Sequence, residues 1–122
     1  MPRTSVVFYR EDDDTVPLLK WFEELPRKAI VKCRLKIERL RELGHELRRP
    51  EADYLRDGIY ELRVSLQGLN YRMLYFFHGL SVTVVSHGIT KERRVPPREI
   101  DIAIQRKIRF AQNPYRHTYE ES

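Results

Sequence analysis

The chain has 122 residues, a hydrophobic fraction of 41% and a formal net charge of +5. That length suits one compact domain, and we expect residues 1–122 to form it. No apolar run approaches the roughly 20 residues that cross a bilayer, and the segment Met1–Thr4 lacks the apolar stretch of a signal peptide. We therefore expect a cytoplasmic protein with no membrane partner. The lone Cys33 has no partner for an intrachain disulfide, and its place on an apolar helical face predicts a buried thiol.

The net charge of the chain indicates which kind of molecule it binds. Lys and Arg total 23 against 18 Asp and Glu, and most of the cations are Arg. The planar guanidinium fork matches phosphate geometry better than an ammonium does. A polyanion such as a nucleic acid is the partner this balance favours, although charge alone does not select it.

The first half of the chain predicts a strand and two helices. Val6–Tyr9 has strand composition, and a helix beginning near Pro17 spaces Leu18, Trp21, Phe22 and Leu25 on one face. Pro26 separates it from a second helix over residues 27–43, which Gly44 ends, so the two form a helical hairpin. The acidic run of residues 11–14 is either a solvated turn or part of a metal site for which the chain offers no obvious further ligands. The basic faces of the hairpin either face solvent or contact RNA or an acidic partner.

The second half predicts three strands and one helix. Strands over residues 59–65, 71–77 and 80–87 are joined by short turns such as Asp57-Gly58 and His78-Gly79, which favours an antiparallel meander. A polar loop over residues 88–95 leads to a helix that begins at Pro96-Pro97, and we expect the tail from Asn113 to Ser122 to be loosely ordered. The order β-α-α-β-β-β-α defines an α+β domain. We predict a small antiparallel sheet with the helical hairpin and the C-terminal helix packed on one side, and a groove on the open side.

Several common catalytic patterns are absent from the sequence, including a glycine-rich phosphate loop and His or Cys pairs at zinc spacing. What remains is a group of cations on or beside the predicted meander: Arg63, Arg72, Lys91, Arg93 and Arg94. If neighbouring strands bring them together, they form a positive concavity. The rings near this concavity are Tyr60, Tyr71, Tyr75 and His87. Such a surface suits single-stranded RNA, with guanidinium groups on phosphate and rings against unpaired bases. The alternative is that the Arg residues form surface ion pairs and the Tyr residues belong to the core.

The central third of the sequence resembles the phage-derived HigB-like branch of the RelE toxins. The matching runs are Leu55-Arg56-Asp57-Gly58-Ile59-Tyr60-Glu61-Leu62-Arg63, Tyr71-Arg72-Met73-Leu74-Tyr75, His87-Gly88-Ile89-Thr90-Lys91 and Val95-Pro96-Pro97-Arg98-Glu99-Ile100, leading to Ala103 and Arg106. The strand and helical hairpin over residues 6–43 also fit the layout of that family, so the likeness extends over nearly the whole chain.

The resemblance implies a type II toxin that cleaves mRNA in the ribosomal decoding site, without a metal or cofactor. The ribose 2′-hydroxyl attacks the adjacent phosphate and leaves a cyclic phosphate. By position, Arg63 and Arg72 match the basic residues of the central strands and act on the phosphate. Lys91 is the candidate base, and His87 is a candidate proton carrier. No residue is assigned as the general acid, because Tyr115 and Tyr119 do not align clearly with the tyrosine of some relatives.

Three further expectations follow from the resemblance. The partners would be the ribosome, its mRNA and an antitoxin of the helix-turn-helix, HigA-like kind. One rival function is inhibition of DNA gyrase, as in ParE-like toxins, which would depend on the helical hairpin rather than on Arg63, Arg72 and Lys91. The other is an RNA-binding phage protein with no catalytic activity.

Overall fold

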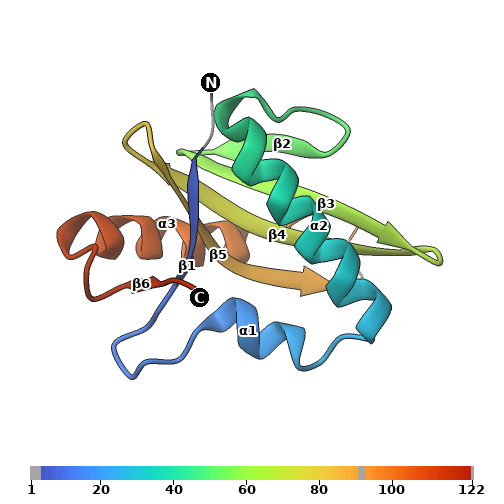
Figure 1. Ribbon diagram of the computed structural model, residues 1–122, viewed down its shortest axis with the longest axis horizontal. Helices are drawn as coiled ribbons and strands as arrows, with labels where there is room; N and C mark the ends of the chain where they lie inside the picture. The colour runs from blue at the N-terminus through green and yellow to red at the C-terminus, as the bar shows by residue number, and fades with distance from the viewer. Residues whose placement is uncertain (1–3, 91–92, 122) are drawn as a thin grey trace.

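A computed structural model describes residues 4–90 and 93–121 and contains a mixed sheet with helices on both faces (Figure 1). The strands are β1 (Ser5–Tyr9), β2 (Ala52–Arg56), β3 (Ile59–Leu66), β4 (Leu69–His78), β5 (Val82–Thr90) and β6 (Thr118–Tyr119). The helices are α1 (Pro17–Phe22), α2 (Arg27–Leu43) and α3 (Pro97–Gln112), with a short 3₁₀ turn, η1 (Gly44–Glu46). The predicted α+β class is confirmed.

The sheet has the strand order β2-β3-β4-β5-β1-β6. Strands β2 to β5 form an antiparallel meander, and β1 lies parallel to β5. The turns Asp57-Gly58 and Gln67-Gly68 have positive φ at both positions, which is the geometry of tight two-residue hairpins. The predicted three-strand meander is confirmed, and β2 extends it by one further strand that was not expected from the sequence.

The helices cover both faces of the sheet, so the prediction that all three pack on one side is wrong. Alternate residues of β1 show the division: Val6 and Phe8 pack with α1 and α2, whereas Val7 and Tyr9 pack with the apolar residues of α3. Successive side chains of a strand point to opposite faces, and both sets are buried here. The face expected to be an open groove is therefore partly covered by α3.

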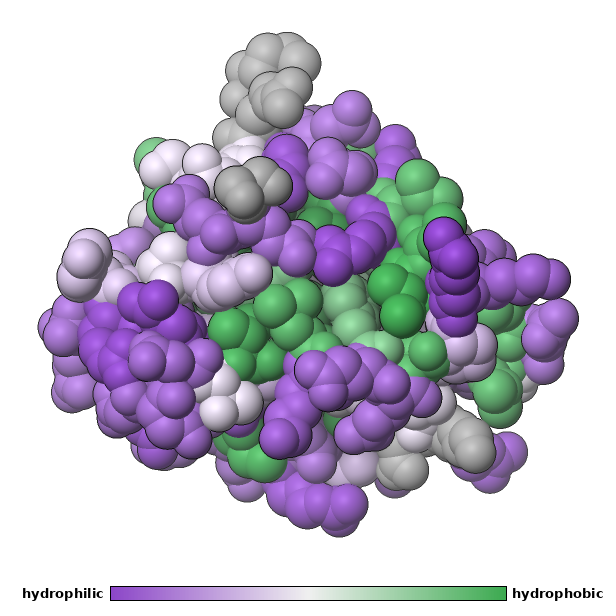
Figure 2. Space-filling model, turned by 60° about the horizontal axis from the view of Figure 1, so that its bottom comes forward, coloured by the Kyte–Doolittle hydropathy of each residue, from purple (hydrophilic) through white to green (hydrophobic). Residues whose placement is uncertain are grey.

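Helix α2 buries one stripe, which includes Ala29, Cys33 and Ile37, and leaves Val31 and Leu35 exposed. The predicted burial of Cys33 is confirmed, and burial raises the pKa of its thiol to about 12. The face that carries α1 has apolar side chains in a central hollow and a polar rim (Figure 2). In residues 4–90 and 93–121, no helix combines the length and apolar character needed to span a membrane.

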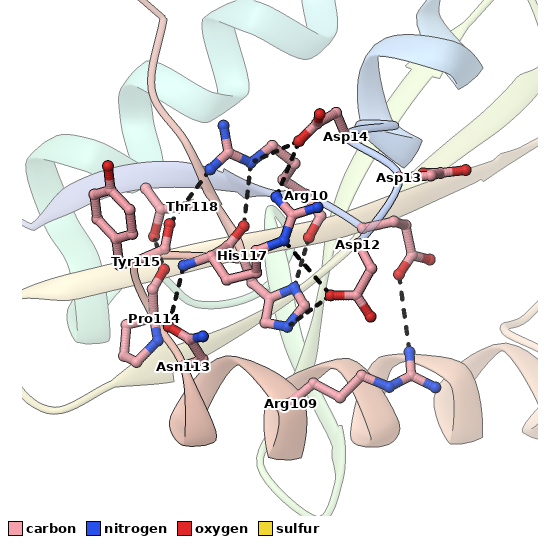
Figure 3. Close-up of polar contacts among 12 residues, drawn as sticks. Arg10, Asp12, Asp13, Asp14, Arg109, Asn113, Pro114, Tyr115, His117 and Thr118 are labelled. Carbon is pink, nitrogen blue, oxygen red and sulfur yellow. Dashed lines mark hydrogen bonds and ion pairs between the residues drawn. The ribbon is translucent and has the colours of Figure 1, made fainter.

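The segment after α3 returns to the start of the sheet. Thr118–Tyr119 forms β6 against Phe8 and Tyr9, and the ring of Tyr9 stacks on that of His117 at 5.0 Å. His117 lies against Arg10 and Asp12, in the segment that follows β1, as Figure 3 shows. Its Nδ1–H donates to the Arg10 carbonyl at 2.8 Å, and its Nε2 lies 3.9 Å from Asp12. The acidic run of residues 11–14 is thus paired with basic groups of the tail and of α3.

Candidate functional site

A basic groove of about 860 Å³ lies where β3 extends beyond the end of β2. Its cationic side chains come from α2, from the two central strands and from the segment before α3: Lys32, Lys36, Arg39, Arg63, Arg72, Arg93 and Arg94. Glu51 and Glu61 are the carboxylates among its described lining residues. This excess of cations gives the groove a positive potential suited to a polyanion.

Arg63 and Arg72 lie directly opposite each other on β3 and β4 and share one face of the sheet. Two guanidinium groups in that register would repel each other. Glu61 lies between them, with its carboxylate 2.7 Å from Nη1 of Arg72 and 3.0 Å from Nη2 of Arg63. Only 3% of Glu61 is exposed, so this carboxylate balances both charges inside the protein.

The two guanidinium groups differ in solvent exposure and in their hydrogen-bond partners. Arg72 is 9% exposed, and its Nη2 donates to the carbonyl of Arg93 at 2.6 Å while Nη1 donates to Glu61. The side chain of Arg63 is 38% exposed and has a second partner, Asp53, at 3.2 Å. The Nε–H of each Arg is buried and lacks an acceptor among the described residues. Buried donors without an acceptor are uncommon, and they mark this pair as a strained part of the structure.

The α2 side of the groove is held by Glu51. Its carboxylate accepts from Arg39 at 2.8 Å and from Lys36 at 3.1 Å. The hydrogen bond from Arg39, assisted by Lys36, lowers the pKa of Glu51 to about 2. Lys32 reaches across to the carbonyl of Ser65 at 3.0 Å. These contacts fix the cations of α2 beside the end of β3.

The tyrosines expected to stack on bases do not offer open rings in this groove. Tyr71 lines it but is 2% exposed, and Tyr75 is 1% exposed. Tyr75 stacks on Tyr60 with ring centroids 5.3 Å apart, on the face covered by α2. Burial raises the pKa of the Tyr75 hydroxyl. Assignment of Tyr71 and Tyr75 to base stacking is therefore corrected: both belong to the core, and Tyr60 lines a different hollow.

His87 lies in a separate buried network rather than in the groove. Arg106 can only donate, so Nδ1 of His87 accepts from it at 3.1 Å, and Nε2–H donates to Glu99 at 2.9 Å. Ser86 also contacts Nδ1, at 2.8 Å. Burial, together with the charge of Arg106, lowers the pKa of His87, so the ring is neutral at pH 7. Both ring nitrogens are occupied, and this contradicts a role for His87 as a mobile proton carrier.

Arg93, Arg94 and Lys91 are the other site residues expected from the sequence. Arg93 and Arg94 are exposed and line the groove, as expected from the sequence. Lys91 lies outside the described residues. Of the described histidine, cysteine, aspartate and glutamate side chains, no three gather in an arrangement that could hold a metal ion.

Two features of the groove are not among the residues predicted from the sequence. Glu61 is buried and bridges Arg63 to Arg72. The signal was its position two residues before Arg63, which places both side chains on one face of a strand. The sequence leaves open whether the basic face of α2 contacts solvent, RNA or an acidic partner, and only the fold shows that three of its cations share a groove with Arg63 and Arg72.

Fold and site together define an α+β domain with a cationic groove at the edge of its sheet, which is a protein class suited to binding a polyanion. The chain belongs to the family described as phage derived protein Gp49-like (DUF891), whose model matches residues 20–108. The matched segment includes α2, the whole meander and most of α3, and therefore all described lining residues of the groove. No curated protein matches the chain.

Proposed function

We propose that this protein is the toxin of a type II toxin–antitoxin system and that it cleaves mRNA in the decoding site of the ribosome. The observation that carries the proposal is the pair Arg63 and Arg72, held opposite each other by the buried Glu61 in a groove rich in cations. Membership in a phage-derived family that is similar to the RelE/HigB toxins supports it. The cellular location that this function implies is the cytoplasm.

The chemistry needs little beyond what such a groove supplies. The ribose 2′-oxygen forms a bond to phosphorus while the bond from phosphorus to the 5′-oxygen breaks. One proton leaves the 2′-hydroxyl and one is delivered to the leaving 5′-oxygen, giving a 2′,3′-cyclic phosphate and a 5′-hydroxyl end. RNA provides its own nucleophile, so the protein contributes alignment, charge stabilisation and proton transfer.

Each residue has a role in this proposal. Arg72, fixed by Glu61 and by the Arg93 carbonyl, provides a preorganised positive charge for the phosphorane. Arg63 is more exposed and binds the phosphate of the incoming strand. Lys91 remains the candidate base by its position in the resemblance to the RelE/HigB toxins. His87 is removed from the catalytic set, and Arg93 and Arg94 contact the RNA backbone.

An antitoxin of the helix-turn-helix kind would be the protein partner of such a toxin. A second function, inhibition of DNA gyrase, is favoured by one observation: Val31 and Leu35 are 51% and 61% exposed on α2. Exposed apolar side chains one helical turn apart are suited to binding another protein. Gyrase inhibition would need Val31 and Leu35 and would tolerate substitution of Arg63 and Arg72.

The test is mapping of mRNA 5′ ends in a translating extract with wild type, Arg72→Lys and Arg98→Ala. Arg98 is the matched control, because its side chain is 80% exposed and it does not line the groove. We expect new 5′ ends in register with codons for wild type and Arg98→Ala, at least 100-fold fewer for Arg72→Lys, and none without ribosomes.

Growth arrest by folded protein without new 5′ ends would refute the nuclease and direct attention to gyrase supercoiling assays. RNA binding without either activity would identify the nonenzymatic alternative.

A further inference from the structure

We propose that the hollow beside β2 binds an unpaired base of the same RNA, stacked on Tyr54, next to the groove where the strand is cut. This inference rests on the proposed function, since it concerns the path of the RNA outside the reacting phosphate. The hollow measures about 520 Å³, and residues from η1, the following loop, β2 and β3 line it. It is distinct from the basic groove, with which it shares no lining residue.

Tyr54 provides an exposed ring in a fixed position. Its side chain belongs to an edge strand and the residue is 54% exposed. The backbone N–H of Gly58 donates to its hydroxyl at 3.1 Å, and its ring meets the ring of Tyr60 edge-on at 5.0 Å. A ring that is already ordered loses little conformational entropy when a base stacks on it.

The charges around Tyr54 favour a nucleotide over an apolar ligand. Arg48 and Arg49 line the hollow, and both are exposed. Arg49 pairs with Asp53 at 3.1 Å, whereas Arg48 has no ion pair or side-chain hydrogen bond within the described parts of the chain. Two guanidinium groups beside an open aromatic ring form the combination that binds single-stranded nucleic acid: cations for phosphate and a π-face for the base.

A chain of ion pairs connects this hollow to the basic groove. Nη2 of Arg49 and Nη2 of Arg63 approach the same oxygen of Asp53, at 3.1 and 3.2 Å. Arg63 in turn contacts Glu61, which binds Arg72. Cations therefore recur from the hollow across β2 and β3 to the proposed cleavage site. An RNA strand in the groove can follow them with its phosphates and place a flanking base on Tyr54.

Base stacking can be measured with the full-length protein and short single-stranded RNAs that carry 2-aminopurine at one position each. Stacking of this base on an aromatic ring quenches its fluorescence. The variants are Tyr54→Ala, which removes the ring, and Tyr54→Phe, which keeps it. Tyr115→Ala is the matched control, because Tyr115 is 89% exposed in the tail. Circular dichroism confirms that each variant is folded.

We expect quenching at one RNA position for wild type, Tyr54→Phe and Tyr115→Ala. For Tyr54→Ala we expect no quenching at that position and a Kd raised roughly 5- to 100-fold. Arg48→Ala should weaken binding and reduce the salt dependence by about one released counterion. Wild-type quenching that Tyr54→Ala leaves intact, or no quenching at any position, would overturn the proposal.

This readout is independent of cleavage. If ribosome-dependent cleavage fails while Tyr54-dependent quenching is present, the proposed nuclease is wrong and the stacking site stands. If cleavage is present and Tyr54→Ala binds and quenches like wild type, the nuclease stands and the stacking site is wrong.

Discussion

Replacement of Glu61 by Ala should destabilise the protein far more than loss of any exposed carboxylate. Glu61 is 3% exposed and pairs with Arg72, which is 9% exposed, at 2.7 Å. Loss of one partner leaves a buried charge uncompensated, which costs about 3–5 kcal/mol. The pair with Arg63 adds under about 1 kcal/mol, because that side chain is 38% exposed and keeps Asp53 as a partner. We therefore expect a loss of about 3–5 kcal/mol for Glu61→Ala.

Urea unfolding followed by circular dichroism measures this loss. With a slope of about 1–3 kcal/mol per molar urea, the midpoint should fall by more than about 1 M. Glu38→Ala is the control, because the Glu38 side chain is 61% exposed and its one ion pair among the described residues is with Arg41, at 3.3 Å. It should cost less than about 1 kcal/mol. Equal losses for the two variants would refute the bridging role of Glu61.

The double variant Glu61→Gln/Arg72→Met gives a further check on this reasoning. If the cost of Glu61→Gln arises from an unbalanced Arg72 charge, removal of that charge should recover part of the lost stability. Strictly additive losses would mean that the two residues stabilise the fold independently.

Three other predictions concern the core. The pKa of His87 in the folded protein lies below its usual 6.5, so the unfolded chain binds a proton more readily than the folded chain does. The free energy of unfolding should therefore fall as the pH drops below about 6.5, by at most about 1.4 kcal/mol per pH unit. Urea unfolding at pH 5–8 measures this slope, and His87→Gln should weaken it. Cys33 is fully buried and its thiol has a pKa of about 12, so a thiol reagent at pH 8 should label it only as the protein unfolds; fast labelling of the native protein, read by absorbance, would contradict its position. Gly88→Ala would place a Cβ atom inside the Trp21 ring, whose indole N–H donates to the Thr90 hydroxyl at 2.9 Å. We expect the free energy of unfolding, measured by thermal unfolding, to fall by about 1–3 kcal/mol. A fall below about 0.5 kcal/mol, the usual scatter of surface substitutions, would show that the ring can move aside.

The sequence predicts the meander well because its strands carry local signals. β3 alternates apolar and polar residues with period two, and the turn Asp57-Gly58 marks its start. β2 has no such signal: its sequence, Ala-Asp-Tyr-Leu-Arg, holds two charged residues and forms a strand by pairing with β3. Tertiary pairing overrides local propensity there, which a single sequence does not show.

The second covered face could have been predicted from β4. Between Tyr71 and Phe77 every residue except Arg72 is apolar, so both faces of this strand are apolar. A strand buried on only one face alternates instead. Leu74 and Phe76 thus require a cover on the face opposite Tyr71, and α3 supplies it with Ala103 and Phe110.

The same alternation separates correct from incorrect site predictions. Arg72 has an even position on β4, whereas Tyr71 and Tyr75 have odd ones, so the rings point away from the guanidinium. The pairing of Arg63 with Arg72 follows from the short turn between β3 and β4 and was within reach of the sequence. The bridge by Glu61 follows from that register, whereas the bond from Arg72 to the Arg93 carbonyl depends on the segment before α3, which is distant in sequence.

The helical cover of both sheet faces explains why the charged site lies at the end of β3 rather than over the middle of a face. Helices cover both faces, so a polyanion can reach the strands only where that cover ends. β3 continues past β2 at this point, and α2 contributes cations from one side while Arg93 and Arg94 contribute them from the other. Arg72 is enclosed at this point, with its side chain 11% exposed, whereas Arg63 lies at the opening, with its side chain 38% exposed. An enclosed charge behind an exposed one suits a site that first captures a phosphate and then stabilises added charge on it.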